Sequence, residues 1–248
     1  MSPRPLVRIA HAYGNRRHRL ERALAAGVDL IETDLRFADG VVWVRHEHRL
    51  WRLPLLYNRR LRGIHREGPL ALAVGPHYFR LDLRPIRLPE VIEAVSGRGG
   101  LMLDLKAGRY APAEAARFVE MVLGTLDTMR FAGHLDFCGG WSLLDLVRAR
   151  APAQTIHYSV DGERDWDAFR ARADGADAIR AITIQRRLLT DERGAFLRDA
   201  GVDFYCWDVE DAADAEHAIA QGAAGIIADD LALLRALAGR PVQTGSAA

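Results

Sequence analysis

The sequence has very little cysteine and lysine, and it has no long apolar run. The two cysteines, Cys138 and Cys206, are too far apart to match the spacing of a zinc or redox motif, so we interpret both as small buried hydrophobic residues. No apolar stretch approaches the roughly 18 residues that a transmembrane helix requires. The N-terminus also lacks the apolar core of a signal peptide, so we expect a cytoplasmic protein without a transmembrane segment.

The chain also lacks an excess of charge of either sign. Its 34 basic residues nearly equal its 33 acidic residues, and the net charge of +1 gives no indication of nucleic-acid binding. Lysine occurs once, as Lys106, and every other strong base is arginine. Codon bias explains why lysine is rare but not where the single lysine lies. A compact ammonium is not interchangeable with a guanidinium, so Lys106 is a candidate functional residue.

Short apolar runs alternate with amphipathic, alanine-rich runs along the chain, as in parallel strands joined by helices. The expected strands are Leu6–His11, Val28–Leu35, Leu101–Lys106, His134–Cys138, Gln154–Val160, Ala181–Gln185, Asp203–Asp208 and Gly225–Ala228. The clearest helical runs are Arg17–Ala26, Pro112–Asp127, Ser142–Ala149, Thr190–Ala200 and Ala212–Gln221. Eight such units predict an α/β fold, a (β/α)8 TIM barrel, for which about 250 residues is typical. An open doubly wound sheet is the alternative.

Two segments interrupt the alternation. Asp39-Gly40 lies between two extended runs and predicts a β-hairpin. Residues 47–86 are too long and irregular for a barrel connection, and they are rich in arginine, histidine, proline and aromatic residues. They predict a long insertion between the second and third barrel strands. We expect residues 1–248 to form one domain with a frayed tail at 240–248.

Carboxylates occur in pairs near the ends of two expected strands. Glu32 and Asp34 lie two residues apart, so their side chains point to the same side of a strand. Neighbouring carboxylates repel unless a cation lies between them, and hard divalent cations prefer carboxylate oxygens. The alternative is a solvated strand end. Asp104 and Lys106 repeat this spacing, which adds a third carboxylate and a positive charge for a phosphate oxygen. An ordinary ion pair is the alternative for them.

Two histidines are expected beside these carboxylates. With Asp39 and Gly40 as the turn, the hairpin register places His46 opposite Thr33. His11 ends the first expected strand, and the C-terminal strand ends form the active face of such barrels. Imidazole titrates near neutral pH, so the two histidines are a candidate acid–base pair. Together with carboxylates and an ammonium, they fit phosphoryl chemistry.

The ordered set of motifs resembles the glycerophosphodiester phosphodiesterase family. The matching segments are Ile9-Ala10-His11, Gly27–Asp34, Asp39-Gly40, Val44-Arg45-His46, Leu88-Pro89-Glu90, Leu103–Lys106, Phe204–Val209 and Gly225–Asp229. The resemblance implies a (β/α)8 barrel, a divalent cation (Mg²⁺ or Ca²⁺) and hydrolysis of a glycerophosphodiester to an alcohol and glycerol phosphate. It implies His11 and His46 as the acid–base pair, Glu32, Asp34 and Asp104 as metal ligands, Lys106 as a phosphate-binding residue, and Trp207 as a pocket residue.

The chain departs from that family after the first histidine. The family has His-Arg-Gly there, whereas this chain reads His11-Ala12-Tyr13-Gly14-Asn15, so Arg16 or Arg17 is the candidate replacement for the missing phosphate-binding arginine. The asparagine and the Asp104-x-Lys106 pattern resemble the sphingomyelinase D/phospholipase D branch. One alternative function is therefore a lysophospholipase D- or sphingomyelinase D-like enzyme whose insertion contacts a membrane surface. Another is a non-catalytic barrel that binds a phosphorylated ligand.

Overall fold

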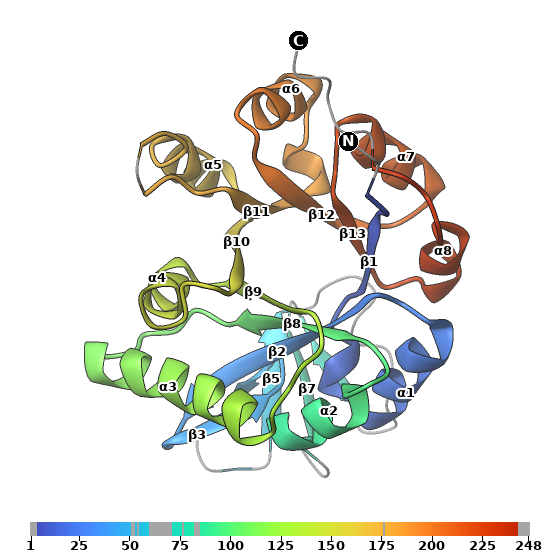
Figure 1. Ribbon diagram of the computed structural model, residues 1–248. Coiled ribbons are helices and arrows are strands. Elements are labelled where there is room, and N and C mark those ends of the chain that lie inside the picture. Colours follow the sequence, from blue (N-terminus) through green and yellow to red (C-terminus); the bar gives the residue numbers. More distant parts are fainter. Residues whose placement is uncertain are drawn as a thin grey trace.

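Eight parallel strands form a closed barrel in this computed structural model, which describes residues 4–50, 53, 55–59, 71–75, 77–81, 85–175 and 177–242 (Figure 1). The barrel strands are β1 (Val7–Ala10), β2 (Leu30–Ala38), β8 (Gly100–Leu105), β9 (Leu135–Gly139), β10 (Thr155–Val160), β11 (Ala181–Gln185), β12 (Asp203–Val209) and β13 (Gly225–Ala228). Strand β1 pairs with both β13 and β2, which closes the ring. The predicted TIM barrel is confirmed, and the open sheet is excluded.

Helices surround the barrel on its outer side (Figure 1). They are α1 (Arg17–Ala26), α2 (Leu88–Val95), α3 (Pro112–Thr128), α4 (Trp141–Arg150), α5 (Glu163–Arg170), α6 (Asp191–Asp199), α7 (Ala212–Ala220) and α8 (Leu231–Ala236), with short 3-10 helices η1 (Tyr13–Asn15) and η2 (Arg186–Leu188). The N-termini of α6, α7 and α8 are capped by the side chains of Thr190, Asp211 and Asp230. Among the helices described, none has the length and apolar composition needed to span a membrane.

The side chains on both faces of the barrel strands are buried, but the two faces pack against different parts of the protein. One apolar cluster fills the barrel interior and includes Leu30 and Met102. A larger cluster, which includes Ile31 and Leu103, packs between the strands and the helices. Because successive side chains on a strand point to opposite faces, Glu32 shares the inner side with Leu30, and Asp104 shares it with Met102. Toward the C-terminal ends of these two strands the interior is therefore lined by carboxylates.

The predicted hairpin is present with the predicted register. Strand β2 extends past the barrel and pairs antiparallel with β3 (Val41–Val44), from Leu35 opposite Val44 to Ala38 opposite Val41. Asp39 and Gly40 form the turn, with φ angles of 53° and 72°. This left-handed pair is the conformation for which Asp-Gly is favoured in two-residue hairpins. The N–H of Arg45 donates to the carbonyl of Asp34 at 2.9 Å, so the ladder reaches the residue before His46.

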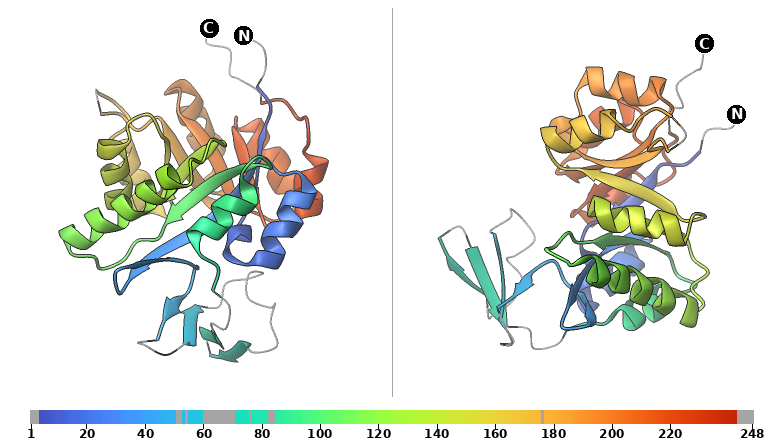
Figure 2. Two further views of the ribbon diagram at one scale, coloured as in Figure 1. Left: turned by 60° about the horizontal axis from the view of Figure 1, so that its bottom comes forward. Right: turned by 90° about the vertical axis from the view of Figure 1, so that its left-hand side faces the viewer.

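The predicted insertion forms a second sheet rather than an irregular loop. Its antiparallel strands are β4 (His48–Arg49), β5 (Leu55–Arg59), β6 (Ala71–Val74) and β7 (His77–Leu81), in the order β4-β5-β7-β6. Figure 2 shows this small sheet beyond one end of the barrel. At the C-terminus, residues 240–242 bond to residues 4–6 through backbone groups. The rest of the expected frayed tail lies outside the described residues.

Candidate active site

A cavity of about 850 Å³ lies among the C-terminal ends of the barrel strands. Six of the seven predicted site residues line it, namely His11, Glu32, His46, Asp104, Lys106 and Trp207. The seventh, Asp34, is fully buried behind Lys106. The strand-end and register arguments thus brought together residues that are up to 95 positions apart in sequence, and the family resemblance added Trp207. Their catalytic and binding roles stay predictions.

His11 lies between two carboxylates. Its Nε2 is 3.6 Å from Glu32 Oε2, and its Nδ1 is 3.5 Å from Asp229 Oδ1. Burial opposes the charge on His11, but Glu32 and Asp229 outweigh it and raise its pKa to about 9. Burial also raises the pKa of Glu32 to about 7, even though His11 favours the carboxylate. The N–H of Ala12 donates to Glu32 Oε2 at 3.1 Å, which fixes that carboxyl group beside the histidine.

Lys106 joins two of the predicted metal ligands. Its Nζ lies 2.7 Å from Asp34 Oδ1 and donates to Asp104 Oδ2. Burial opposes its charge, but Asp104 and Asp34 raise the pKa of Lys106 well above its ordinary value. Asn15 holds the other side of Asp34, since its amide donates to Oδ2 and its Oδ1 accepts the Asp34 N–H at 2.9 Å. Lys106 and Asp104 thus form the ordinary ion pair that was the alternative interpretation. The Lys106 ammonium also lines the cavity.

His46 differs from His11 in its surroundings. The side-chain amide of Asn58, from β5 of the inserted sheet, contacts His46 Nδ1, and the Arg36 guanidinium donates to the His46 carbonyl at 2.8 Å. Burial lowers the pKa of His46, although Asp34 acts in the opposite direction. The surroundings therefore favour the charged form of His11 and the neutral form of His46. The contact from Asn58 shows that the insertion reaches the site.

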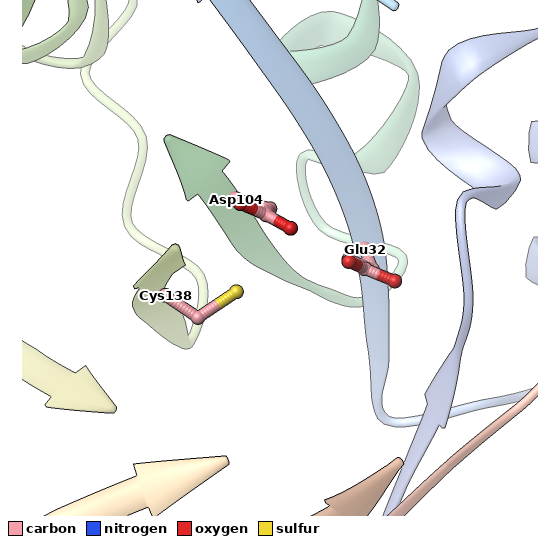
Figure 3. Close-up of side chains that lie close together, drawn as sticks. All are labelled: Glu32, Asp104 and Cys138. Carbon is pink, nitrogen blue, oxygen red and sulfur yellow. The ribbon is translucent and has the colours of Figure 1, made fainter. Parts of the chain in front are cut away.

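Part of this site fits a divalent cation. One ligand atom each from Glu32, Asp104 and Cys138 lie within 4.8 Å of one another, and all three residues are buried (Figure 3). Two carboxylates facing one buried space are the chemistry that a cation requires. Oδ1 of Asp104 is also buried and has no hydrogen-bond partner among the described residues. Asp34, which was also predicted as a ligand, contacts Lys106 and Asn15, and its role as a ligand stays a prediction.

The sequence analysis missed several residues that line the cavity, because the spacing of residues within one strand does not show which residues of other strands lie beside them. Asp229 follows β13 as His11 follows β1, so the same strand-end rule could have found it. Cys138 was interpreted only as a buried residue, although the register places it beside Asp104. Arg36 and Arg187 also line the cavity and are now better candidates for phosphate contact.

The two arginines proposed to replace the missing one lie elsewhere. Arg17 is exposed and pairs with Glu90 on α2. Arg16 lies 4.0 Å from Glu47, at the base of the inserted sheet. Neither is among the residues that line the cavity.

Comparison with solved structures identifies the fold. The chain is similar to a putative glycerophosphoryl diester phosphodiesterase from Silicibacter pomeroyi DSS-3 (TM-score 0.72, 21% identity, 96% of this chain and 94% of that chain). A second such protein, from Agrobacterium tumefaciens str. C58, has a TM-score of 0.70 at 18% identity over 94% of this chain and 97% of that one. This chain has the glycerophosphodiester phosphodiesterase fold.

An Oleispira antarctica phosphodiesterase, solved in complex with the product sn-glycerol-3-phosphate, is also similar (TM-score 0.66, 14% identity, 95% of this chain and 96% of that chain). No family model matches the sequence, and no curated protein matches it. At these identities the comparison establishes architecture, and the activity has to be argued from the residues of the cavity.

Proposed function

We propose that this protein is a metal-dependent phosphodiesterase that hydrolyses glycerophosphodiesters to an alcohol and glycerol phosphate. The observation that carries the proposal is that two histidines, a lysine and two of the three predicted metal ligands line one cavity at the active end of the barrel. The shared fold with glycerophosphodiester phosphodiesterase structures supports the same substrate class. The product bound to the Oleispira enzyme is the product that this reaction would release.

Each group has a role in that reaction. Lys106 and Arg36 supply positive charge to the phosphodiester oxygens, and Trp207 borders the substrate. Acid–base catalysis needs one group that gives a proton and one that takes a proton, and the opposite pKa shifts of His11 and His46 support this division. A cation held by buried carboxylates such as Glu32 and Asp104 would neutralise charge on the phosphoryl group.

Release of glycerol 3-phosphate from glycerophosphocholine tests the proposal. We expect turnover with Mg²⁺, Ca²⁺ or another divalent ion and loss of turnover with EDTA. His11→Ala and His46→Ala should each lower the rate by about 10²–10⁴-fold, because each removes one proton-transfer group. His18→Ala is the matched control, since His18 lies exposed on α1. Wild-type protein that binds the diester without hydrolysing it would instead support the non-catalytic barrel.

The inserted sheet favours a second candidate, a lysophospholipase D-like enzyme. Among the described residues, the large apolar side chains that are exposed all belong to the insertion, namely Leu53, Leu72, Val74 and Leu81. The strand register places Leu72 and Val74 on the same face as Phe79 and Leu81. Residues 47–86 also contain eight arginines against three acidic residues. An apolar face within a cationic segment suits an anionic lipid surface.

Parallel assays separate the two candidates. A lipid enzyme would hydrolyse lysophosphatidylcholine in anionic vesicles faster than glycerophosphocholine. Leu72→Asp with Val74→Asp should then slow only the lipid reaction, and glycerophosphocholine turnover is the internal control. Equal rates on both substrates, unaffected by the double variant, would exclude the lipid candidate.

A further inference from the structure

Cys138 lies in the same layer of the barrel interior as two acidic residues. The strand register pairs Asp34 with Asp104 and Asp104 with Cys138, so the three residues occupy neighbouring strands at one height. Cys138 belongs to the apolar cluster inside the barrel and also lines the cavity. Its thiol therefore lies beside the carboxylates at the cavity end of the barrel interior.

The thiol points toward two carboxylates. Figure 3 shows the side chains of Glu32, Asp104 and Cys138 directed from β2, β8 and β9 into a common space. Their ligand atoms lie within 4.8 Å of one another. Tetrahedral ligands at roughly 2.0–2.3 Å from one ion lie about 3.3–3.8 Å apart, so side-chain movements of about 1 Å would let all three bind the same ion.

A second observation also points to a ligand at this position. Asp104 is nine-tenths buried, and its Oδ1 has no hydrogen-bond partner within the described part of the chain. A buried carboxylate oxygen without a partner is costly unless a cation or proton satisfies it. The backbone approaches closely here, since a Cβ on Gly139 would lie 2.4 Å from that oxygen. Lys106 satisfies only the other oxygen, Oδ2.

Asp34 is less available to a cation than the sequence suggested. It is bound on one side by the Lys106 ammonium and on the other by Asn15. A donor set of Glu32, Asp104 and Cys138 contains two oxygens and one sulfur. Thiolate sulfur favours Zn²⁺ and similar ions, whereas Mg²⁺ and Ca²⁺ take oxygen ligands.

We propose that Cys138 is a metal ligand together with Glu32 and Asp104, and that the site therefore prefers Zn²⁺, Co²⁺ or Cd²⁺ to Mg²⁺ and Ca²⁺. The inference deepens the proposed function and rests on its metal site. On coordination the thiol binds as thiolate and releases its proton to solvent.

Titration of the full-length, EDTA-treated protein with Co²⁺ tests this inference without an activity assay. A thiolate ligand produces a thiolate-to-cobalt charge-transfer band in the near ultraviolet, and we expect this band at one equivalent of Co²⁺. Cys138→Ser should abolish the band and weaken Zn²⁺ and Cd²⁺ binding by at least about tenfold. Cys206→Ser is the matched control, because Cys206 is also buried but is not in the carboxylate group.

Each outcome is decisive. A band that persists in Cys138→Ser, or Co²⁺ binding by wild-type protein without the band, would overturn the inference but leave the proposed metal-dependent activity intact. If wild-type protein binds no divalent ion, the metal site fails, and the metal dependence of the proposed function fails with it. Should Cys138→Ser not fold, the band in wild-type protein and in Cys206→Ser still assigns the ligand to Cys138.

Discussion

The Lys106 ammonium compensates two buried carboxylates, and its removal should be costly. Its Nζ lies 2.7 Å from Asp34 Oδ1 and donates to Asp104. Asp34 is fully buried, and four-fifths of the Lys106 side chain is buried as well. Removing one partner of a buried ion pair leaves an uncompensated charge, which costs about 3–5 kcal/mol. A pair on the surface would be worth only about 0–1 kcal/mol.

We therefore expect Lys106→Met to lower the free energy of unfolding by about 3–5 kcal/mol at pH 7. Urea unfolding in EDTA, followed by circular dichroism, measures this loss. Lys106→Arg is the matched variant, since it keeps a positive charge. It should retain most of the stability but lose phosphodiester hydrolysis, because a planar guanidinium does not reproduce the position of a compact ammonium.

The stability loss should also depend on pH. Burial alone would raise the pKa of Asp34, but Lys106 and His46 outweigh it and hold that pKa below its ordinary value of 3.8. A carboxyl group with a depressed folded-state pKa stabilises the protein above the ordinary pKa, and this contribution is lost as pH falls through the folded-state pKa. In Lys106→Met the effect of burial on Asp34 is no longer opposed by the ammonium, so the pKa of Asp34 rises and the difference between wild type and variant should shrink as pH falls through that raised pKa. A loss under about 1 kcal/mol at pH 7, or one independent of pH, would refute the reasoning.

Four further predictions concern single substitutions at other positions. Asp229→Asn should lower the pKa of His11 from about 9, as measured by NMR titration of the imidazole; an unchanged pKa would contradict the role of that contact. Gly139→Ala should destabilise the fold by about 1–3 kcal/mol, because its φ of 112° is strained for alanine and a Cβ would lie 2.5 Å from a backbone oxygen. Gly124→Ala, in open space on α3, should instead stabilise the fold by about 0.5–1 kcal/mol in the same urea assay. Burial would raise the pKa of Asp136, but hydrogen bonds and nearby charges outweigh it and lower that pKa. Wild type should therefore be more stable than Asp136→Asn at pH 7, and the difference in free energy of unfolding should shrink as pH falls below about 4.

The barrel could be predicted from sequence because its strands are short, β-branched and regularly separated by helices. The expected helix Arg17–Ala26 has the observed ends, and the other four expected helices differ by one residue at one end or at both. Helices α2, α5 and α8 were not predicted, since each has eight residues or fewer and offers too few turns for a clear 3.6-residue pattern.

The inserted sheet could not be predicted for a different reason. Its strands pair only with one another, and the sequence gives no register for strands joined by long irregular connections. The pairing of β5 with β7 brings together segments about 20 residues apart. As a result, the contact between Asn58 and His46 was outside the reach of sequence reasoning, although His46 itself was placed correctly beside the carboxylates.

The metal ligands show most clearly what residue spacing can and cannot determine. Spacing two apart on neighbouring strands requires that Glu32, Asp34 and Asp104 share the barrel interior, and it therefore requires positive charge among them. It does not say which cation compensates which carboxylate. In the structure Lys106 contacts both Asp34 and Asp104, and the thiol of Cys138 lies within 4.8 Å of ligand atoms of Asp104 and Glu32. The single lysine thus contacts two of the carboxylates that the sequence assigned to a metal ion, and the thiol of Cys138, which the sequence analysis treated only as a buried residue, lies beside the third, Glu32.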